Sequence, residues 1–577
     1  MSHQAQRRQG RLGRRVSAVG AAAVLAAAMA TAGATSANAI EPLAEVDGEV
    51  LADLAAGGTA EFIVYLDQRA DLAPASTIAD RTDRLQFVYD RLTTTADRSQ
   101  AGLRAMLEAR GVEFTPFWIS NAVLVNGDRA LLDRIAASPE VSHIGPNATV
   151  DLVEPVEFTS ADDTIQAVEW GVANINADDV WADFGVTGGG IVVANIDTGV
   201  QYNHPALVNQ YRGNLGGGSF DHNYNWWDPA GVCSPGVPCD NHGHGTHTMG
   251  TMVGDDGGSN QVGVAPGAQW MAAKGCESGS CSSSSLLSSG QFVVAPTDTN
   301  GNNPDPSKAP HIVNNSWGGG GGDTWYADTV NAWVAAGIFP MFSAGNSGPS
   351  CGSAGSPGDY AQSYAVGAYD INNTIASFSS RGPSNVDGGT KPNVSAPGVS
   401  VRSSVPTNGY GNASGTSMAS PHASGVVALV WSANSDFIGD INGTRSVLDG
   451  TARDVSDSQC GGTSGNNNVW GEGRIDALAA VTLATGGDPP PPPPPDDLVA
   501  DFTFDCAKVR GDRSCTFDGG ASVGDIVSWD WDLDDGVTAS GEVVTTTYQG
   551  GRTRAVTLTV TDTDGATDSI TKSVPMP

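Results

Sequence analysis

The chain has 577 residues, with 29 Lys and Arg against 63 Asp and Glu, a formal net charge of -34, and a hydrophobic content of 40%. That length predicts several domains, and the hydrophobic content excludes a wholly disordered chain. A chain this acidic lacks the basic surface needed to bind nucleic acid or an anionic membrane.

The first 39 residues have the composition of an export signal. Arginines precede an alanine-rich apolar stretch over 18–34, and Ala37-Asn38-Ala39 places small residues where a signal peptidase cuts. A membrane anchor is the alternative, but the stretch is short and weakly hydrophobic. We expect residues 1–39 to be removed and the mature protein to be secreted and extracellular.

Eight cysteines suit an oxidising compartment, in which disulfides persist. Six of them form pairs that are close in sequence, and the last two would pair by elimination, although other connectivities stay open. A zinc site is the alternative, but no Cys-x-x-Cys spacing occurs. The favoured pairs are Cys233 with Cys239, Cys276 with Cys281, Cys506 with Cys515, and Cys351 with Cys460.

The segment after the signal alternates strand and helix patterns. Residues 61–66 read as a strand, and 80–110 carry apolar residues at helical spacing. A second apolar run covers 117–125, a short helix is expected over 128–137, and 141–144 ends the pattern. Such an alternation predicts a small α+β module.

The pattern changes in the following segment, 159–486. Short apolar runs without clean alternation suit buried strands of a parallel sheet, and helical stretches with Gly-rich loops lie between them. We therefore expect an α/β domain with one doubly wound parallel sheet. The expected strands include 191–196, 311–313 and 338–342, and the expected helices include 324–336 and 421–433.

A linker and a third domain complete the chain. Seven consecutive prolines over 489–495 predict an extended spacer within 487–497, although a ligand for an SH3-type domain is an alternative. Residues 498–577 consist of short alternating strands, which predict a small all-β sandwich.

Four short segments of the middle domain carry side chains with catalytic chemistry. Asp197 follows the run 191–196, His244 opens His-Gly-Thr-His, Asn346 ends Ser-Ala-Gly-Asn, and Ser417 lies in Gly-Thr-Ser-Met-Ala-Ser-Pro-His. Each lies near the end of an expected strand or the start of an expected helix. In a doubly wound sheet these positions meet at one crevice, so we expect the four side chains to converge.

These residue types suit nucleophilic catalysis. The hydroxyl of Ser417 needs an adjacent base, and the imidazole of His244 is the natural base near neutral pH. A buried carboxylate, Asp197, would fix the tautomer of that ring and stabilise the imidazolium. The amide of Asn346 would hold the oxyanion, with the backbone N–H of Ser417 as second donor because a helix is expected to begin there.

In the order Asp, His, Ser, these segments resemble the subtilisin-like serine proteases of the peptidase S8 family. The similarity covers 165–480, and the segments 314–318 (Asn-Asn-Ser-Trp-Gly) and 247–250 (His-Thr-Met-Gly) are most similar to the bacillopeptidase F-like branch. The resemblance implies a serine endopeptidase whose triad is Asp197, His244 and Ser417, with Asn346 in the oxyanion hole. It also implies substrate contacts through two segments, Ser316-Trp317-Gly318 as the pairing edge and Ser343-Ala344-Gly345 as the pocket lining.

Residues 40–158 resemble the inhibitor I9-type propeptide of that family, a ferredoxin-like α+β module. Parallel sheets fold slowly because their contacts are distant in sequence, which gives a folding assistant a physical rationale. The resemblance implies a zymogen that processes itself near 156–168 and an intramolecular inhibitor. The other expected partners are protein or peptide substrates, and we expect a monomer.

The C-terminal domain resembles a PKD β-sandwich. Residues 529–536, Trp-Asp-Trp-Asp-Leu-Asp-Asp-Gly, are similar to the signature Trp-Asp-Phe-Gly-Asp-Gly, with Asp534 and Asp535 in place of Gly-Asp. In secreted proteases this module is linked to binding insoluble protein or polysaccharide. An inert folded spacer is the alternative.

The sequence departs from the family at a metal ligand. The family commonly carries His-Pro-Asp-Leu after the catalytic aspartate, and that Asp binds a tight calcium ion, whereas Ala206 stands there in this chain. We do not carry that calcium over, although Asp255 and Asp256 offer the oxygen ligands that calcium prefers. No cofactor is expected to be required for catalysis.

Two functions of other classes remain open. The first is an adhesin that keeps the protease fold as a scaffold while the C-terminal module binds matrix. The second is a metal-dependent hydrolase whose metal ion is held by His242, His244 and His247. An intact triad argues against the first, and the role of His244 as base argues against the second. We expect a secreted serine endopeptidase that acts through an acyl-enzyme.

Overall fold

The computed structural model describes residues 44–153, 155–160, 167–488, 500–509, 512–522, 526–534, 536–549, 551–562 and 567–576. The export signal expected over 1–39 and the prolines expected to form a spacer over 489–495 lie outside these residues. Across the described ranges, no helix is both long and apolar enough to cross a bilayer.

The N-terminal module is a five-stranded sheet in the order β1-β5-β2-β4-β3, with helices between its strands. The neighbours are antiparallel except for β1 and β5. The order β5-β2-β4-β3, with α2 and α3 after β2 and α4 after β4, is the ferredoxin-like arrangement. The elements are β1 Glu45–Val46, α1 Gly48–Asp53, β2 Ala60–Leu66, α2 Arg81–Ser99, α3 Ala101–Glu108, β3 Phe114–Phe117, β4 Ala122–Gly127, α4 Arg129–Ala136 and β5 Val141–Pro146.

Two elements of this module differ from the sequence prediction. The helix expected over 80–110 is divided at Gln100, whose buried side-chain amide donates to the backbone carbonyls of Phe117 and Ala122. The apolar run over 117–125 is a hairpin, because a turn separates β3 from β4. Hydrophobic spacing alone does not mark either break.

The middle domain is built on a seven-stranded sheet in the order β12-β14-β9-β17-β18-β19-β20, and all neighbours are parallel. The strands are buried on both faces, which explains their continuous apolar runs. Successive residues of one strand enter different cores: Ile312 joins one cluster, and Val313 joins the other. The bounds are β9 Val192–Asp197, β12 Trp226–Trp227, β14 Gln269–Lys274, β17 Ile312–Asn315, β18 Phe339–Ser343, β19 Tyr364–Tyr369 and β20 Val394–Pro397.

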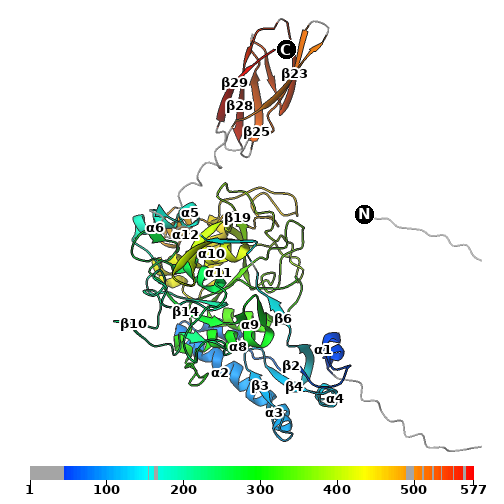
Figure 1. The fold of residues 1–577 in the computed structure, drawn as a ribbon, viewed down its shortest axis with the longest axis vertical. Coiled ribbons are helices and arrows are strands. Elements are labelled where there is room, and N and C mark those ends of the chain that lie inside the picture. The colour runs from blue at the N-terminus through cyan, green and yellow to red at the C-terminus, as the bar shows by residue number, and fades with distance from the viewer. Residues whose placement is uncertain are drawn as a thin grey trace, which may run out of the picture. The chain divides into compact units, whose positions relative to one another are not determined.

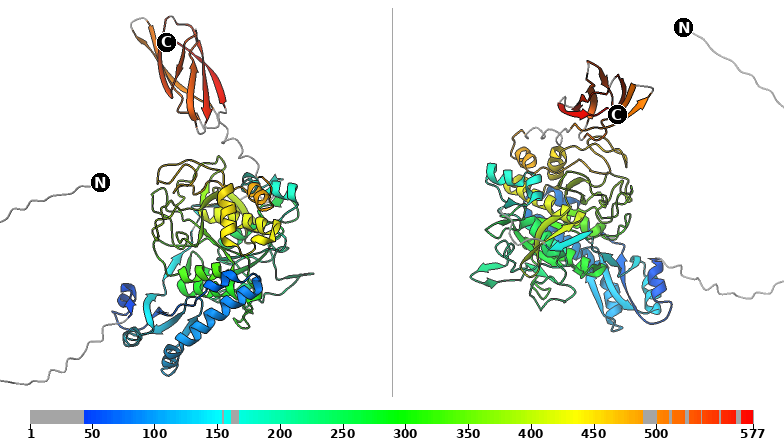
Figure 2. Two further views of the ribbon diagram at one scale, coloured as in Figure 1. Left: turned by 180° about the vertical axis from the view of Figure 1, so that it is seen from behind. Right: turned by 45° about the horizontal axis from the view of Figure 1, so that its top comes forward.

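Helices cover both faces of this sheet, as expected for a doubly wound fold (Figures 1 and 2). Residues of α5, α6, α7, α10, α11 and α12 join one core cluster, and residues of α8 and α9 join the other. The bounds are α5 Trp170–Asn174, α6 Ala177–Phe184, α7 His244–Val253, α8 Ser283–Val294, α9 Ala327–Ala336, α10 Thr416–Ala433, α11 Ile441–Thr451 and α12 Ala477–Ala484.

Short strands form small sheets around the main one, and two of these sheets matter for the site. The first has the order β15-β16-β6 and the second has the order β21-β22-β7, both antiparallel. The bounds are β6 Thr149–Asp151, β7 Glu157–Ser160, β8 Ala167–Val168, β10 Asn214–Gly216, β11 Ser219–Phe220, β13 Asn260–Gln261, β15 Cys276–Glu277, β16 Ser280–Ser282, β21 Val401–Val405 and β22 Gly409–Ser414.

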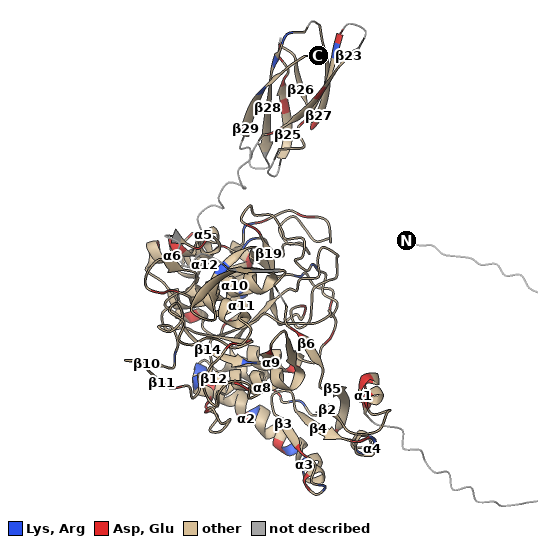
Figure 3. Ribbon diagram, in the orientation of Figure 1, with Lys and Arg blue, Asp and Glu red and all other residues tan. Residues whose placement is uncertain are grey.

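The N-terminal module contacts the middle domain through α2, which carries basic segments (Figure 3). The guanidinium of Arg84 donates to the carbonyls of Val334 and Ala335 at the end of α9, at 2.9 and 2.6 Å, and to that of Gly439. The last carbonyls of a helix have no partner within it, so a cation that donates to them is stabilising. Leu85 of α2 lies in the same core cluster as the residues of α9.

The C-terminal domain is a sandwich of two antiparallel sheets, β23-β24-β27 and β26-β25-β28-β29. Phe502, Phe517, Trp531 and Leu558 are buried between them in one core cluster. The bounds are β23 Thr503–Val509, β24 Asp512–Asp518, β25 Ile526–Asp532, β26 Thr538–Ser540, β27 Val543–Tyr548, β28 Arg554–Asp562 and β29 Thr567–Val574.

Four disulfides link the described residues, and they are the pairs that the sequence favours. They join Cys233 to Cys239, Cys276 to Cys281, Cys351 to Cys460, and Cys506 to Cys515. None of the described cysteines is free.

Candidate active site

Asp197 and His244 form a buried pair. Asp197 ends β9, and its Oδ1 accepts a hydrogen bond from its neighbour's backbone, Thr198 N, at 2.7 Å. His244 begins α7, and its Nδ1 lies 2.8 Å from Asp197 Oδ1, with both side chains fully buried. A carboxylate only accepts, so Nδ1 carries the proton and Nε2 is left as the basic nitrogen. The pair therefore has the geometry that prepares a histidine for general-base chemistry.

Ser417 lies in the first turn of α10, which begins at Thr416. This agrees with the expectation that a helix begins at Ser417, although the apolar run marked only 421–433, and it directs the first backbone N–H groups of the helix out of its N-terminus. The Ser417 hydroxyl donates to the carbonyl of Val153 at 2.6 Å. The candidate nucleophile thus faces a peptide carbonyl of the chain itself.

Asn346 lies beside the turn that precedes Ser417. Its Oδ1 accepts from the backbone N–H and the hydroxyl of Thr416, both at 2.9 Å. These bonds fix the orientation of the amide, so its Nδ2 is directed away from the Thr416 N–H and hydroxyl. A Cβ placed on Gly415 would lie 3.1 Å from that Nδ2, which puts the amide donor against the backbone next to Ser417.

The sheet brings these segments together at the carboxyl ends of its strands. β17 pairs with β9, with Asn315 opposite Ile196, so Ser316, which directly follows β17, lies beside Asp197, which ends β9. The Ser316 hydroxyl donates to the carbonyl of Ser417 at 3.1 Å, and α7 packs on α10. The four predicted side chains therefore lie together at the carboxyl ends of the strands.

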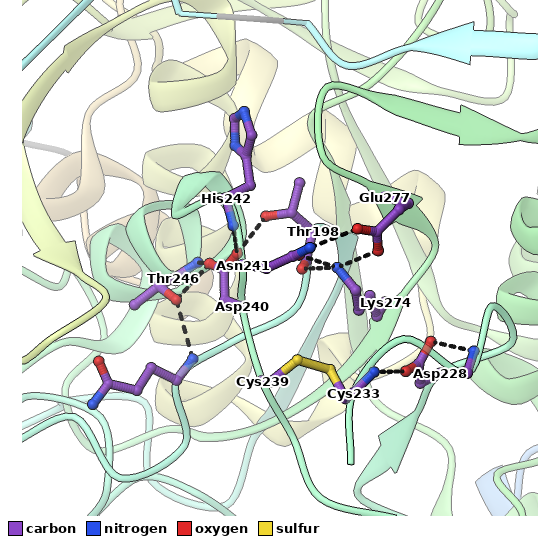
Figure 4. The surroundings of a disulfide bond; sticks show 12 residues. Thr198, Asp228, Cys233, Cys239, Asp240, Asn241, His242, Thr246, Lys274 and Glu277 are labelled. Carbon is purple, nitrogen blue, oxygen red and sulfur yellow. Dashed lines mark hydrogen bonds and ion pairs between the residues drawn. A yellow bond between two sulfur atoms is a disulfide. The ribbon is translucent and has the colours of Figure 1, made fainter. Parts of the chain in front are cut away.

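Asp240 anchors the loop that leads into α7 and therefore to His244, and the sequence prediction did not include it (Figure 4). Asp240 Oδ1 accepts from the N–H of Gly243 and from the hydroxyl of Thr198, at 2.8 and 3.0 Å. Its Oδ2 accepts from the N–H and the hydroxyl of Thr246, at 2.9 and 2.6 Å. Asp240 thus caps the first turn of α7, and an acidic residue just before a helix start is the signal that predicts such a cap.

Lys274 supports the same loop from the end of β14 (Figure 4). Its fully buried ammonium donates to the carbonyl of Thr198 and to Asn241 Oδ1, both at 2.7 Å. It also lies 3.2 Å from Glu277 Oε2. The ammonium therefore links the segments that carry Asp197 and His244.

The Cys233–Cys239 disulfide ends directly before Asp240 (Figure 4). Replacing both cysteines with serine should lower the free energy of unfolding by about 2 kcal/mol, because the short cross-linked loop gains freedom in the unfolded chain. The apparent Tm should fall by several degrees and casein hydrolysis should decrease. Replacing Cys506 and Cys515 is the control, because that pair lies in the C-terminal domain. Equal activity losses from both replacements would contradict this role.

The three histidines of His-x-His-x-x-His do not point to one centre. The ring of His247 is buried, and its Nε2 lies 3.0 Å from the carbonyl of Val401, while His244 Nδ1 faces Asp197 and His242 is exposed. Burial, with the nearby His244 as a second cause, lowers the pKa of His247 to about 3, so its ring is neutral. Over the described part of the chain, no three His, Cys, Asp or Glu residues are grouped to hold a metal ion.

Buried histidines predict a loss of stability in acid. Burial lowers the pKa of His247 and His311 to about 3 and that of His422 to about 4, below the ordinary value of 6.5. The folded state therefore binds fewer protons, and the stability present above pH 6.5 is lost as the pH falls towards these values, by up to about 1.4 kcal/mol per pH unit for each ring. The apparent Tm of the Ser417→Ala chain should fall steadily between pH 6.5 and 4.5.

His422→Gln should make that fall less steep, because it removes one of the three rings. A Tm that changes equally with pH in both chains would contradict the assignment.

The position of the family's calcium-binding aspartate is apolar. Ala206 is fully buried in a small cluster with Val262 and Tyr410. Asp256 Oδ2 accepts from the side-chain amide of Asn260 at 2.7 Å, and its Oδ1 accepts from the N–H of Gly258 at 2.8 Å. These contacts occupy the carboxylate with protein donors, so they give no specific support to a calcium ion at Asp256.

The predicted substrate-binding segments divide into those that line the cleft and those that support it. The backbone of Trp317 bridges to Leu152, but its indole is buried and packs edge-on against Tyr326 and Phe342. A cavity of about 440 Å³ is lined by Gly318, Ser343, Gly345 and Asn346, among others. Ala344 is buried and does not line it.

The site combines a hydroxyl, a buried imidazole–carboxylate pair and an amide at the carboxyl ends of parallel strands. These are the groups of a serine-type hydrolase. Comparison with known proteins agrees with that class. The sequence model of the subtilase family matches residues 188–473, and that of the PKD domain matches residues 499–576.

Three similar relatives illustrate the match. Bacillopeptidase F of Bacillus subtilis (strain 168) is 41% identical over 422 residues, which is 69% of this chain and 29% of that protein. M-protease of Shouchella clausii (strain KSM-K16) is 33% identical over 60% of this chain and 76% of that protein. Subtilisin Savinase of Lederbergia lenta is 34% identical over 55% of this chain and 99% of that protein. The chain therefore belongs to the subtilase family of serine-type endopeptidases, although it spans less than a third of the length of bacillopeptidase F.

Proposed function

We propose that the protein is a secreted endopeptidase that hydrolyses protein substrates through an acyl-enzyme on Ser417. The Ser417 hydroxyl attacks the carbonyl carbon, and His244 Nε2 takes its proton and returns it to the leaving amine. Asp197 holds the ring in the required tautomer. Water then hydrolyses the ester by the same route in reverse.

The oxyanion is held in this proposal by the Asn346 amide and the backbone N–H of Ser417. The orientation of Asn346 supports this role, because Thr416 occupies its oxygen and its Nδ2 is directed to the Gly415 side of the turn. Donors fixed in advance cost no reorganisation when charge develops, so they stabilise the transition state strongly.

The observation that carries the proposal is the combination of two short contacts. Asp197 and His244 are joined at 2.8 Å in a fully buried pair, and the Ser417 hydroxyl lies 2.6 Å from a peptide carbonyl oxygen.

Casein hydrolysis by the purified protein tests this function. Phenylmethylsulfonyl fluoride, which acylates an activated serine, should abolish the activity, and a brief treatment with EDTA should leave it unchanged. The reverse pattern would support the metal-dependent hydrolase. Lack of activity of the processed protein on any peptide would support the adhesin.

We also propose that residues 40–158 act as an I9-type propeptide that inhibits the enzyme in cis, and that export depends on residues 1–39. The ferredoxin-like topology and the contacts of α2 with the end of α9 support the first point. Four disulfides support passage through an oxidising compartment.

For the C-terminal domain we propose binding to insoluble protein or polysaccharide. It exposes apolar side chains that include Val527 at 58% and Val543 at 56%. Co-sedimentation of the Ser417→Ala chain with insoluble protein fibres should decrease when both valines are replaced with serine. Equal sedimentation would favour an inert spacer.

A further inference from the structure

Residues 149–153 lie between two edges of the middle domain as an added strand. On one side β6 pairs antiparallel with β16, and the N–H of Leu152 donates to the carbonyl of Gly279 at 3.1 Å. On the other side the N–H of Val153 donates to Ser316 at 3.3 Å, and Gly318 donates to Asp151 at 3.2 Å. This is the way a peptide binds to an exposed sheet edge.

The residues that follow Val153 in the chain are also paired with the middle domain, beyond Ser417. The N–H of Val156 donates to the carbonyl of Ser414 at 2.7 Å, and β7 pairs antiparallel with β22. Val153, whose carbonyl accepts from Ser417, thus lies between two paired segments of one continuous chain. Pairing on both sides fixes which peptide carbonyl faces the nucleophile.

The side chains of this segment also occupy the cleft as those of a substrate would. Leu152 and Val150 are buried, at 3% and 8% exposure, in the core cluster that contains Leu286 of α8. Val153 lines the cavity described above, to which the middle domain contributes only glycine, serine and asparagine residues. The only charged residue that lines the cavity is Asp151 of the same segment. The surface that the middle domain contributes is uncharged, so it accepts an apolar side chain and disfavours a charged one.

We infer that self-processing breaks the peptide bond on the carboxyl side of Val153, an inference that rests on the proposed function. Ser417 Oγ bonds to the Val153 carbonyl carbon while its proton passes to His244. The C–N bond breaks, and the amide nitrogen of the following residue takes that proton. Water then cleaves the ester, which restores the Ser417 hydroxyl and leaves a carboxylate on Val153.

This bond lies before the stretch 156–168, in which the sequence led us to expect the cut. Residues 157–160 are paired with β22 instead of lying at Ser417. After cleavage the backbone pairing would keep Val153 in the cleft as a product inhibitor, and β7 would stay as an edge strand of the mature enzyme.

The C-terminus of the released N-terminal fragment tests the inference. The purified wild-type precursor is refolded from denaturant and sampled at the earliest times, and its first fragments are identified by mass spectrometry. The first N-terminal fragment should end at Val153. A first fragment that ends at any other residue would overturn the inference.

Matched substitutions test the same bond in the wild-type background. Val153→Asp should slow the first cut at least about tenfold, because it puts a second negative charge beside Asp151 in a pocket to which the middle domain contributes no charged group. Val537→Asp, the same change at a residue of the C-terminal domain that is 42% exposed, should alter it by less than about twofold. Equal rates would overturn the inference, and if Val153→Asp fails to fold, the fragment analysis above decides alone.

Failure of the inference can be told from failure of the proposed function. If the cut lies elsewhere while the mature enzyme still hydrolyses casein and reacts with phenylmethylsulfonyl fluoride, only the inference is wrong. Absence of both activities would instead refute the proposed function.

Discussion

Ser417→Ala should abolish casein hydrolysis and stop removal of the N-terminal module. The variant lacks the atom that forms the ester, and loss of the nucleophile of a subtilisin-type triad lowers kcat by about 10⁶, a magnitude measured on a member of this family. The Ser417 hydroxyl donates to Val153 and, more weakly, to the carbonyl of Ser316 at 3.4 Å, so its loss should leave the fold intact. Activity on casein and the mass of the purified chain measure both effects.

Ser432→Ala is the matched control for that experiment. It makes the same change in the same helix, at a hydroxyl that donates to the carbonyl of Gly189. This variant should process itself and hydrolyse casein normally. Complete self-processing of purified Ser417→Ala, without added enzyme, would remove Ser417 from the nucleophilic role.

Asn346→Ala should lower kcat by about 10²–10³ with little change in KM, the range known for loss of one oxyanion donor in a member of this family. The amide acts on charge that exists only in the transition state, so substrate binding should be almost unaffected. Kinetics on a soluble peptide substrate separate the two constants.

Asn346→Asp distinguishes the donor from the structural contacts of the same side chain. Aspartate keeps an oxygen for the N–H and hydroxyl of Thr416 but replaces the amide donor with an anion. Its kcat should be as low as that of Asn346→Ala, or lower, at an unchanged Tm. A kcat close to that of the wild type in either variant would exclude Asn346 from the oxyanion hole.

Much of the fold follows from hydrophobic pattern. Runs such as 191–196 and 338–342 predicted buried parallel strands because burial on both faces removes the polar alternation. The break at Gln100 could not be predicted this way, because it depends on a buried amide that finds carbonyls of the later hairpin. The start of α10 beside Ser417 was expected from the small residues that precede it, although the first residues of this helix give no helical periodicity of their own.

The candidate active site was likewise predicted only in part. The four chemical groups are recognisable from residue type and order, but their supports are contacts between distant segments. Lys274 holds the His244 loop through contacts with the Thr198 carbonyl and with Asn241 that no sequence pattern marks, whereas Asp240 carries the signal of a helix cap. The position of Val153 at Ser417 likewise depends on strand pairing on both sides.

Ser417 is, in this proposal, a nucleophile that His244 and Asp197 activate. A fluorophosphonate probe reacts with such a serine, so the processed protein should take up one label, and peptide mapping should locate it on Ser417. His244→Ala should lose the label while keeping its Tm. A label on another residue, or an unlabelled but folded and processed protein, would contradict the account.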